Sequence, residues 1–161
     1  MPKTTETVLE IDLTALGKNY HYLKSRIKDT TKLLGVVKAF AYGSDAVIIA
    51  KELEALGVDY LAVAYVNEGV ILRDVGIKTP ILVLHPQPEN FETLIDRCLE
   101  PSLYNESVLK QFIKIASEKK QLNYPVHLKF NTGLNRLGFN EAEVDKIISE
   151  LNATSTIKIT S

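Results

Sequence analysis

The sequence predicts an α/β fold in which strands and helices alternate along the chain. Short apolar runs alternate with longer segments of helical period, and such units build a parallel sheet with helices packed on it. An open dinucleotide-binding sheet would carry Gly-x-Gly-x-x-Gly after its first strand, and the chain has no such motif. The better match is therefore a partial (β/α)8 barrel of the TIM type.

The first elements follow from local patterns. Residues 7–12 alternate in the manner of a half-buried strand, and Asp12 is a suitable N-cap for a helix whose apolar positions are Leu16, Tyr20, Leu23 and Ile27. Residues 32–38 form a nearly continuous apolar run, which predicts a strand buried on both faces. A helix over 46–56 should end at Gly57.

The same unit then recurs without a linker. We expect strands at 59–64, 80–84, 99–103, 125–130 and 157–160, with helices at 66–75, 89–97, 107–119 and 141–151. Pro101 weakens the prediction for its strand because proline lacks the N–H group. A complete barrel needs at least roughly 200 residues. Residues 1–161 are thus expected to form the N-terminal portion of a barrel, about five to six βα units.

Composition excludes several classes of protein. The net charge is -1 with acids and bases interspersed, so no basic patch for nucleic acid or an anionic membrane is expected. No apolar run reaches the roughly 18 residues of a membrane-spanning helix, and no signal peptide is recognisable. The single cysteine, Cys98, fits a reducing cytoplasm.

Functional groups of a parallel β/α fold collect where its strands end. Those positions hold Lys38, Tyr65, Leu84-His85 and Lys129, and Tyr42 lies in the first loop. A lysine desolvated at the end of a buried strand has the lowered pKa that Schiff-base chemistry needs. A lysine that simply emerges into water remains the alternative interpretation.

A second polar cluster follows the strand at 125–130. Lys129 and Arg136 flank a turn favoured by Asn131 and Gly133, and two cations could hold an anion there. A capped turn with two solvated charges is the alternative. His127 is expected to be a satisfied core histidine, and no metal-ligand spacing is present.

Four stretches together resemble the N-terminal part of the alanine racemase family. They occur in the family's order and spacing and span nearly the whole chain: Glu10-Ile11-Asp12-Leu13 through Asn19; Val36-Val37-Lys38-Ala39-Phe40-Ala41-Tyr42-Gly43; Leu61-Ala62-Val63-Ala64 through Glu68 to Leu84; and His127-Leu128-Lys129 through Asn135-Arg136-Leu137-Gly138.

The resemblance implies pyridoxal 5'-phosphate bound through Lys38 and interconversion of L- and D-alanine. It implies that Tyr42 contacts the cofactor phosphate and that Leu84 packs beside the cofactor. Lys129 matches a lysine that is often carbamylated in the family, and Arg136 matches the arginine that it orients toward the cofactor and substrate. Lys38, Lys129 and Arg136 are the catalytic residues on this basis, and the parent enzyme would be a cytoplasmic homodimer that supplies D-alanine for the cell wall.

The chain also departs from the family pattern. Phe40 and Ser44-Asp45 stand where Asn and His-Gly are common, and Asn131 stands where Asp is usual. The family's second base is a tyrosine of a C-terminal β domain of the partner subunit, and the later barrel strands carry most phosphate contacts. These parts lie outside the 161 residues, so we expect an inactive fragment of the enzyme.

Other functions remain open. The chain could be a pyridoxal-phosphate-binding barrel that racemises nothing, or a non-catalytic interaction domain for which Lys38 would not matter. A different amino acid substrate, such as serine or one with a bulkier side chain, is also compatible with the sequence.

Overall fold

The computed structural model describes residues 7–161, which form a six-stranded parallel sheet in the order β1-β2-β3-β4-β5-β6. The strands are β1 (Leu34–Val36), β2 (Tyr60–Val63), β3 (Ile81–Val83), β4 (Glu100–Leu103), β5 (Tyr124–Leu128) and β6 (Ile157–Ile159). The helices are α1 (Leu13–Lys24), α2 (Lys38–Gly43), α3 (Ala46–Ala55), α4 (Val66–Asp74), α5 (Phe91–Asp96), α6 (Glu106–Glu118) and α7 (Val144–Asn152), with short 3-10 turns η1 (Pro88–Asn90) and η2 (Glu141–Glu143).

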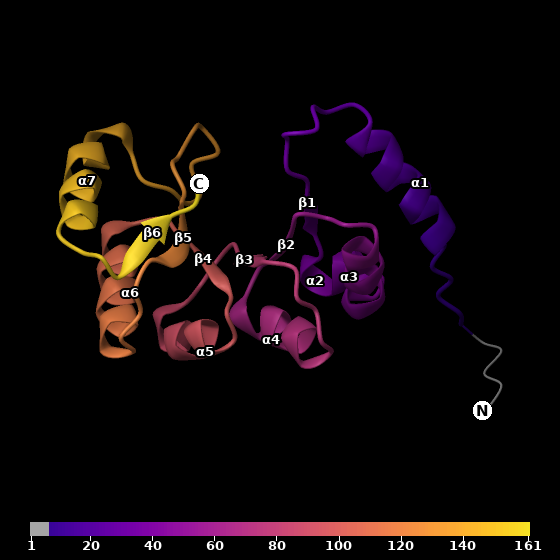
Figure 1. Cartoon of the computed structure of the whole chain (residues 1–161), viewed down its shortest axis with the longest axis horizontal. Coiled ribbons are helices and arrows are strands. Elements are labelled where there is room, and N and C mark those ends of the chain that lie inside the picture. Colours follow the sequence, from indigo (N-terminus) through magenta and orange to yellow (C-terminus); the bar gives the residue numbers. More distant parts are fainter. Residues whose placement is uncertain (1–6) are drawn as a thin grey trace.

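Each strand pairs in parallel with the next strand along the chain, as in the first part of a β/α barrel. Figure 1 shows the strands following a curve from β1 to β6, with α3, α4, α5 and α6 along its convex side. This arrangement confirms the predicted fold class, a partial barrel of βα units.

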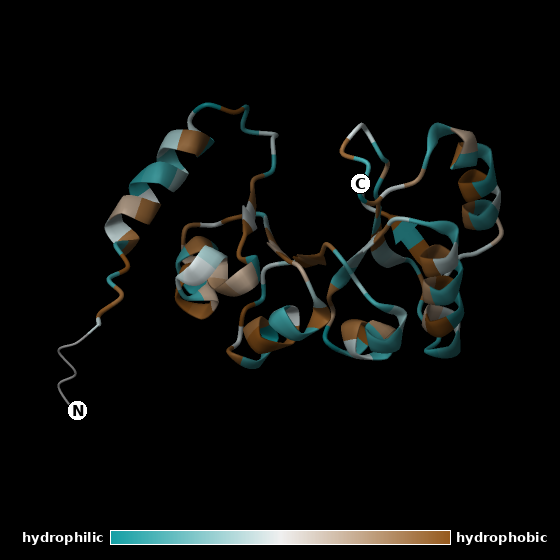
Figure 2. Cartoon of the chain, turned by 180° about the vertical axis from the view of Figure 1, so that it is seen from behind, coloured by the Kyte–Doolittle hydropathy of each residue, from teal (hydrophilic) through white to brown (hydrophobic). Residues whose placement is uncertain are grey.

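The hydrophobic core lies between the strands and the helices. Leu61, Val63, Ile81 and Val83 are completely buried on this side of the sheet. Hydropathy follows the same division, with brown segments on the strands and the inner sides of the helices (Figure 2). Burying each such side chain stabilises the fold by about 1.5–3 kcal/mol. The helical face of the sheet is therefore the stable part of the molecule.

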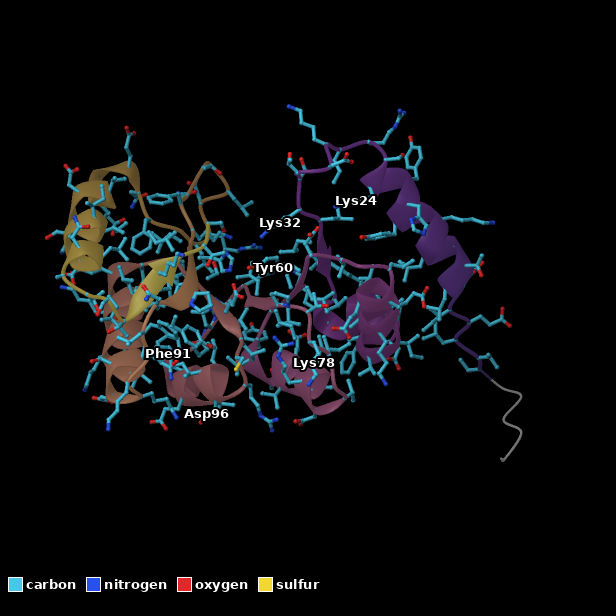
Figure 3. All side chains as sticks on the ribbon, in the orientation of Figure 1. Lys24, Lys32, Tyr60, Lys78, Phe91 and Asp96 are labelled. Carbon is cyan, nitrogen blue, oxygen red and sulfur yellow. The ribbon has the colours of Figure 1, made fainter. Side chains whose placement is uncertain are left out.

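The concave face of the sheet is more open, and it corrects the prediction for residues 32–38. Leu34 and Val36 of β1 are 40% and 38% exposed, so this strand is not buried on both faces. Gly35 faces Leu53 of α3 on the other side. β1 is an edge strand that helices cover on one face alone. In Figure 3, Lys32 and Tyr60 lie on the open side, and the Lys32 ammonium is 5.8 Å from the Tyr60 ring centroid.

The predicted strand at residues 7–12 was wrong. These residues form no strand, and Val8 and Leu9 are 69% and 63% exposed. Alternation predicts a strand only where a neighbouring strand can pair with it, and no strand lies beside this segment in the sheet order. The helix start was correct, because the Asp12 carboxylate accepts a hydrogen bond of 2.9 Å from the Ala15 N–H.

Candidate functional site

Residues at the carboxyl ends of the strands line a common cavity of about 370 Å³. Lys38 follows β1, Leu84 follows β3, and Lys129 follows β5. Arg136 reaches the cavity from the loop after β5. The full lining is Lys38, Ala64, Tyr65, Leu84, His85, Lys129, Arg136 and Leu137. The fold therefore brings together four of the five predicted site residues, although they are far apart in sequence.

The fifth, Tyr42, lies outside this lining. Its side chain is 70% exposed, and its ring centroid lies 6.0 Å from the Lys38 Nζ. Tyr42 thus flanks Lys38 on the solvent side of the cavity. Lys38 itself is half-buried at the cavity wall, not sealed inside the protein.

Lys38 is placed by an unusual backbone segment. Ala39, Phe40, Ala41 and Tyr42 have φ of 51°, 54°, 51° and 60°, so the central part of α2 is a left-handed helical turn. This conformation costs roughly 1–2 kcal/mol for each residue with a Cβ. The Ala41 N–H donates to the Val37 carbonyl at 3.0 Å. Such sustained strain is typical of functional sites, where the surrounding structure compensates for it.

The end of this turn joins the next helix directly. Asp45, one of the departures from the family pattern, accepts a hydrogen bond of 2.9 Å from the Ile48 N–H and caps α3. An acceptor at this position satisfies a free N–H group of the first helical turn. Asp45 therefore has a structural function that the sequence comparison alone did not assign.

Lys129 and Arg136 belong to a loop closed by backbone hydrogen bonds. The Phe139 N–H donates to the Lys129 carbonyl and the Asn131 N–H donates to the Phe139 carbonyl, each at 2.8 Å. The Asn131 side-chain oxygen accepts from the N–H groups of Gly133 and Asn135, both at 3.1 Å. The turn predicted around Asn131 and Gly133 is confirmed, and it holds the two cations at the mouth of the cavity.

The electrostatics of the cavity favour an anion. Lys38, Lys129 and Arg136 carry positive charge, and no carboxylate is among the lining residues. Across residues 7–161, the salt bridges involve other cations. A phosphate or carboxylate would therefore find charge-assisted donors that the protein does not already occupy.

Aromatic residues form one wall of the cavity. The His85 ring stacks on Tyr104 with centroids 5.4 Å apart and meets Tyr65 edge-on at 5.6 Å. His85 Nε2 lies 2.8 Å from the Gln87 side-chain nitrogen. His85 Nδ1 is buried and has no hydrogen-bond partner in the described part of the chain. Tyr104, which directly follows β4, is buried against the His85 ring and does not itself line the cavity. Sequence analysis did not predict this support for His85.

A polar layer lies deeper on the concave face. His127 Nε2 is 2.8 Å from a Glu100 carboxylate oxygen, and its Nδ1 is 2.7 Å from the Ser161 hydroxyl. Tyr60 donates to the same Glu100 oxygen at 3.3 Å. Burial, together with the Glu100 carboxylate, raises the pKa of the Tyr60 hydroxyl. His127 is thus a buried, hydrogen-bonded histidine, as predicted.

Residues 7–161 show neither a metal centre nor a membrane-spanning helix. No group of His, Cys, Asp and Glu side chains there is arranged to hold a metal ion. None of the helices in this part of the chain is both long and apolar enough to cross a bilayer.

Known proteins similar to this chain share one description. A family profile described as "Alanine racemase, N-terminal domain" matches residues 11–161. "Alanine racemase 2" of Oceanobacillus iheyensis is 39% identical over 139 residues, covering 86% of this chain and 35% of that protein. The alanine racemase of Halothermothrix orenii is 36% identical over 157 residues, covering 97% and 41%.

Solved structures agree with these relatives. An alanine racemase structure from Clostridium difficile 630 superposes with a TM-score of 0.82 at 39% identity, covering 88% of this chain and 37% of that chain. The enzyme from Bacillus anthracis, with bound L-Ala-P, gives a TM-score of 0.88 at 28% identity and covers 100% and 42%. The chain thus spans about two fifths of the length of the proteins it matches. Because the family profile matches nearly every residue, the chain belongs to the alanine racemase N-terminal domain family.

Proposed function

We propose that this chain forms the cofactor-holding part of an alanine racemase, an isomerase that interconverts L- and D-alanine. The observation that carries the proposal is the cavity in which Lys38 meets Leu84, Lys129 and Arg136. A primary amine beside two further cations and an apolar wall matches the chemistry of pyridoxal 5'-phosphate, which offers an aldehyde, an aromatic ring and a phosphate.

Each residue has a proposed task toward the cofactor. Lys38 would hold it through its aldehyde carbon, and Leu84 would pack against its ring. Tyr42, on the solvent side of Lys38, would contact the phosphate. When bound, the cofactor supplies an electron sink that acidifies the α-hydrogen of an amino acid.

The remaining steps belong to the protein. Lys38 Nζ, once released from the cofactor, would accept or return the α-proton on one face of the substrate. Arg136 would orient cofactor and substrate through its planar guanidinium. Lys129, at the base of the same loop, would position Arg136 once carbamylated, because a carbamate offers the guanidinium an anionic acceptor that an ammonium lacks.

Racemisation needs a proton carrier on each face of the substrate. We assign the opposite face to a tyrosine of a partner subunit, as the family resemblance implies, so a homodimer is part of the proposal. A cytoplasmic location belongs to it as well, and the lone Cys98 supports a reducing compartment.

The first test adds pyridoxal phosphate to the 161-residue chain, reduces the mixture with borohydride and maps the modified lysine by mass spectrometry. The expected result is selective labelling of Lys38, which Lys38→Ala removes. Lys32→Ala is the matched control, because Lys32 lies on the same face shortly before β1 and should not affect labelling. Labelling scattered over many lysines and unchanged in Lys38→Ala would contradict the proposal.

A further inference from the structure

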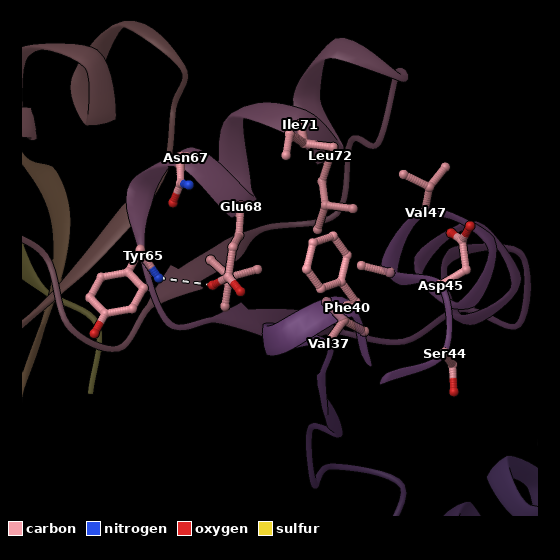
Figure 4. Close-up of a pocket in the computed structure, with 12 residues that line it drawn as sticks. Val37, Phe40, Ser44, Asp45, Val47, Tyr65, Asn67, Glu68, Ile71 and Leu72 are labelled. Atoms are coloured by element: carbon pink, nitrogen blue, oxygen red, sulfur yellow. Dashed lines mark hydrogen bonds between the residues drawn. The ribbon is translucent and has the colours of Figure 1, made fainter. Parts of the chain in front are cut away.

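Glu68, in the first turn of α4, connects the ends of β1 and β2. One carboxylate oxygen accepts a hydrogen bond of 2.7 Å from the Ala39 N–H. The other accepts from the N–H groups of Ala64 at 2.7 Å and Tyr65 at 3.0 Å. Figure 4 shows the Tyr65 bond. A single side chain thus joins two strand ends that are neighbours in the sheet.

The bond to Ala39 satisfies a group that the sheet leaves unpaired. The β1–β2 hydrogen bonds end with the Val37 N–H donating to the Ala62 carbonyl at 2.9 Å. Ala39 comes directly after Lys38 and is the first residue of the left-handed turn. Its N–H donates to the Glu68 carboxylate, which thus takes the place of a backbone acceptor.

The Glu68 side chain lies beside an apolar surface. The Glu68 carboxylate is half-buried at the edge of a second cavity of about 370 Å³, whose apolar lining includes Val37, Phe40 and Leu72. Figure 4 shows Glu68 between Tyr65 and these apolar side chains. A hydrogen bond from a backbone N–H to a charged carboxylate is stronger than one to a neutral acceptor.

We propose that Glu68 is a positioning residue for Lys38, which it directs into the cofactor cavity by anchoring the start of the left-handed turn. The inference rests on the proposed function, since it assigns Lys38 the task of holding the cofactor. Glu68 would touch neither cofactor nor substrate, and it would act on Lys38 through its hydrogen bond with the Ala39 backbone.

Glu54 provides a matched comparison within the same chain. It is also half-buried, and it accepts hydrogen bonds from the Lys78 N–H, the Thr79 N–H and the Thr79 hydroxyl at 2.7, 2.7 and 2.9 Å. These contacts lie just before β3, at the opposite end of the strands from Lys38. Loss of Glu54 should therefore weaken the fold without affecting the direction of Lys38.

The decisive variant is Glu68→Gln. Glutamine keeps one acceptor oxygen, which can retain the two bonds from Ala64 and Tyr65. Its amide NH2 group then faces the Ala39 N–H, donor against donor, so the variant releases the turn while preserving the cap of α4. Because the two bonds at the start of α4 remain, we expect Glu68→Gln to fold as wild type does.

The experiment measures the rate at which pyridoxal phosphate labels Lys38, after borohydride reduction, in wild type, Glu68→Gln and Glu54→Ala. In labelling, the Lys38 amine condenses with the aldehyde and releases water, and borohydride then reduces the carbon–nitrogen double bond. We expect Glu68→Gln to label Lys38 at least about tenfold more slowly, and Glu54→Ala to match wild type among folded molecules. Equal rates in Glu68→Gln and wild type would overturn the inference.

A second measurement separates this inference from the proposed function. If wild type shows no selective labelling, the proposed function fails, and amide hydrogen exchange then decides the role of Glu68. Faster exchange at Ala39 in Glu68→Gln, with the Ile48 amide capped by Asp45 unchanged, would support the anchoring of the turn. Unchanged exchange at Ala39 would refute it.

Discussion

The two ends of the parallel strands are built in different ways. At the N-terminal end, the charged side chain of Arg73 is held by hydrogen bonds within the protein. It donates to the carbonyls of Ile77, Thr79, Arg97 and Cys98 at 2.8–3.2 Å. At the C-terminal end, Lys38, Lys129 and Arg136 line a cavity without a carboxylate, and a left-handed turn carries Lys38. The first end stabilises the sheet, whereas the second leaves its charges available for a ligand.

The largest effect is expected from Arg73→Ala. Removing the guanidinium leaves four carbonyls without their donor, two in partly buried bonds (Ile77 and Thr79) and two in exposed ones (Arg97 and Cys98), which should lower the free energy of unfolding by about 3 kcal/mol. Urea unfolding measures this loss. Arg73→Lys should recover only part of it, because one ammonium cannot reach both strand starts. A loss below about 1 kcal/mol would show that the N-terminal end is not the stabilising end.

A glycine pair tests the loop at the other end. Both Gly133 and Gly138 have positive φ, 121° and 133°, but only a Cβ at Gly138 would meet backbone, with the Asn131 nitrogen 2.5 Å away. Gly138→Ala should destabilise the loop by about 2 kcal/mol, and Gly133→Ala by about 1 kcal/mol.

Hydrogen exchange of the Asn131 amide, which donates to the Phe139 carbonyl, reports on the loop directly. Exchange should accelerate more in Gly138→Ala than in Gly133→Ala. Equal acceleration would mean that the close approach at Gly138 does not hold Lys129 and Arg136 in place.

The smallest effect concerns acid stability. Burial raises the pKa of the Glu54 carboxyl, but hydrogen bonds from the backbone and side chain of Thr79 and from Lys78 lower it more, so the net pKa is below its usual 4.5. A lowered carboxyl pKa stabilises the fold fully above the unfolded-state value, and this contribution is lost as the pH falls through the folded-state pKa.

The stability difference between wild type and Glu54→Ala, about 1 kcal/mol at pH 7, should therefore shrink at pH values below 4.5. Urea unfolding at neutral and acidic pH measures it. A difference that grows on acidification would have the wrong sign for this carboxylate.

Local patterns predicted most of the fold. The N-cap at Asp12, the helix end at Gly57 with φ of 83° and the buried strand β4 despite Pro101 all follow from neighbouring residues. Two predictions were wrong, a strand at 7–12 and a β1 buried on both faces. Both properties depend on what lies beside the segment in space. Alternation and apolarity describe a chain segment, not its neighbours.

The candidate site was predictable to a different extent. The rule that functional groups gather at strand ends predicted that Lys38, Leu84 and Lys129 lie close together, and all three line the cavity. Neither the left-handed turn nor the contact of Glu68 with Ala39 could be predicted, since alanine and phenylalanine normally avoid positive φ.

The order of the strands has a consequence for synthesis on the ribosome. Each strand pairs with the one made just before it, so the sheet can grow from β1 to β6 as the chain emerges, without waiting for distant partners. Lys38 is made early and Arg136 late, so the cavity is complete only after the loop that follows β5 has left the exit tunnel. Cofactor capture would then come after most of the sheet has assembled.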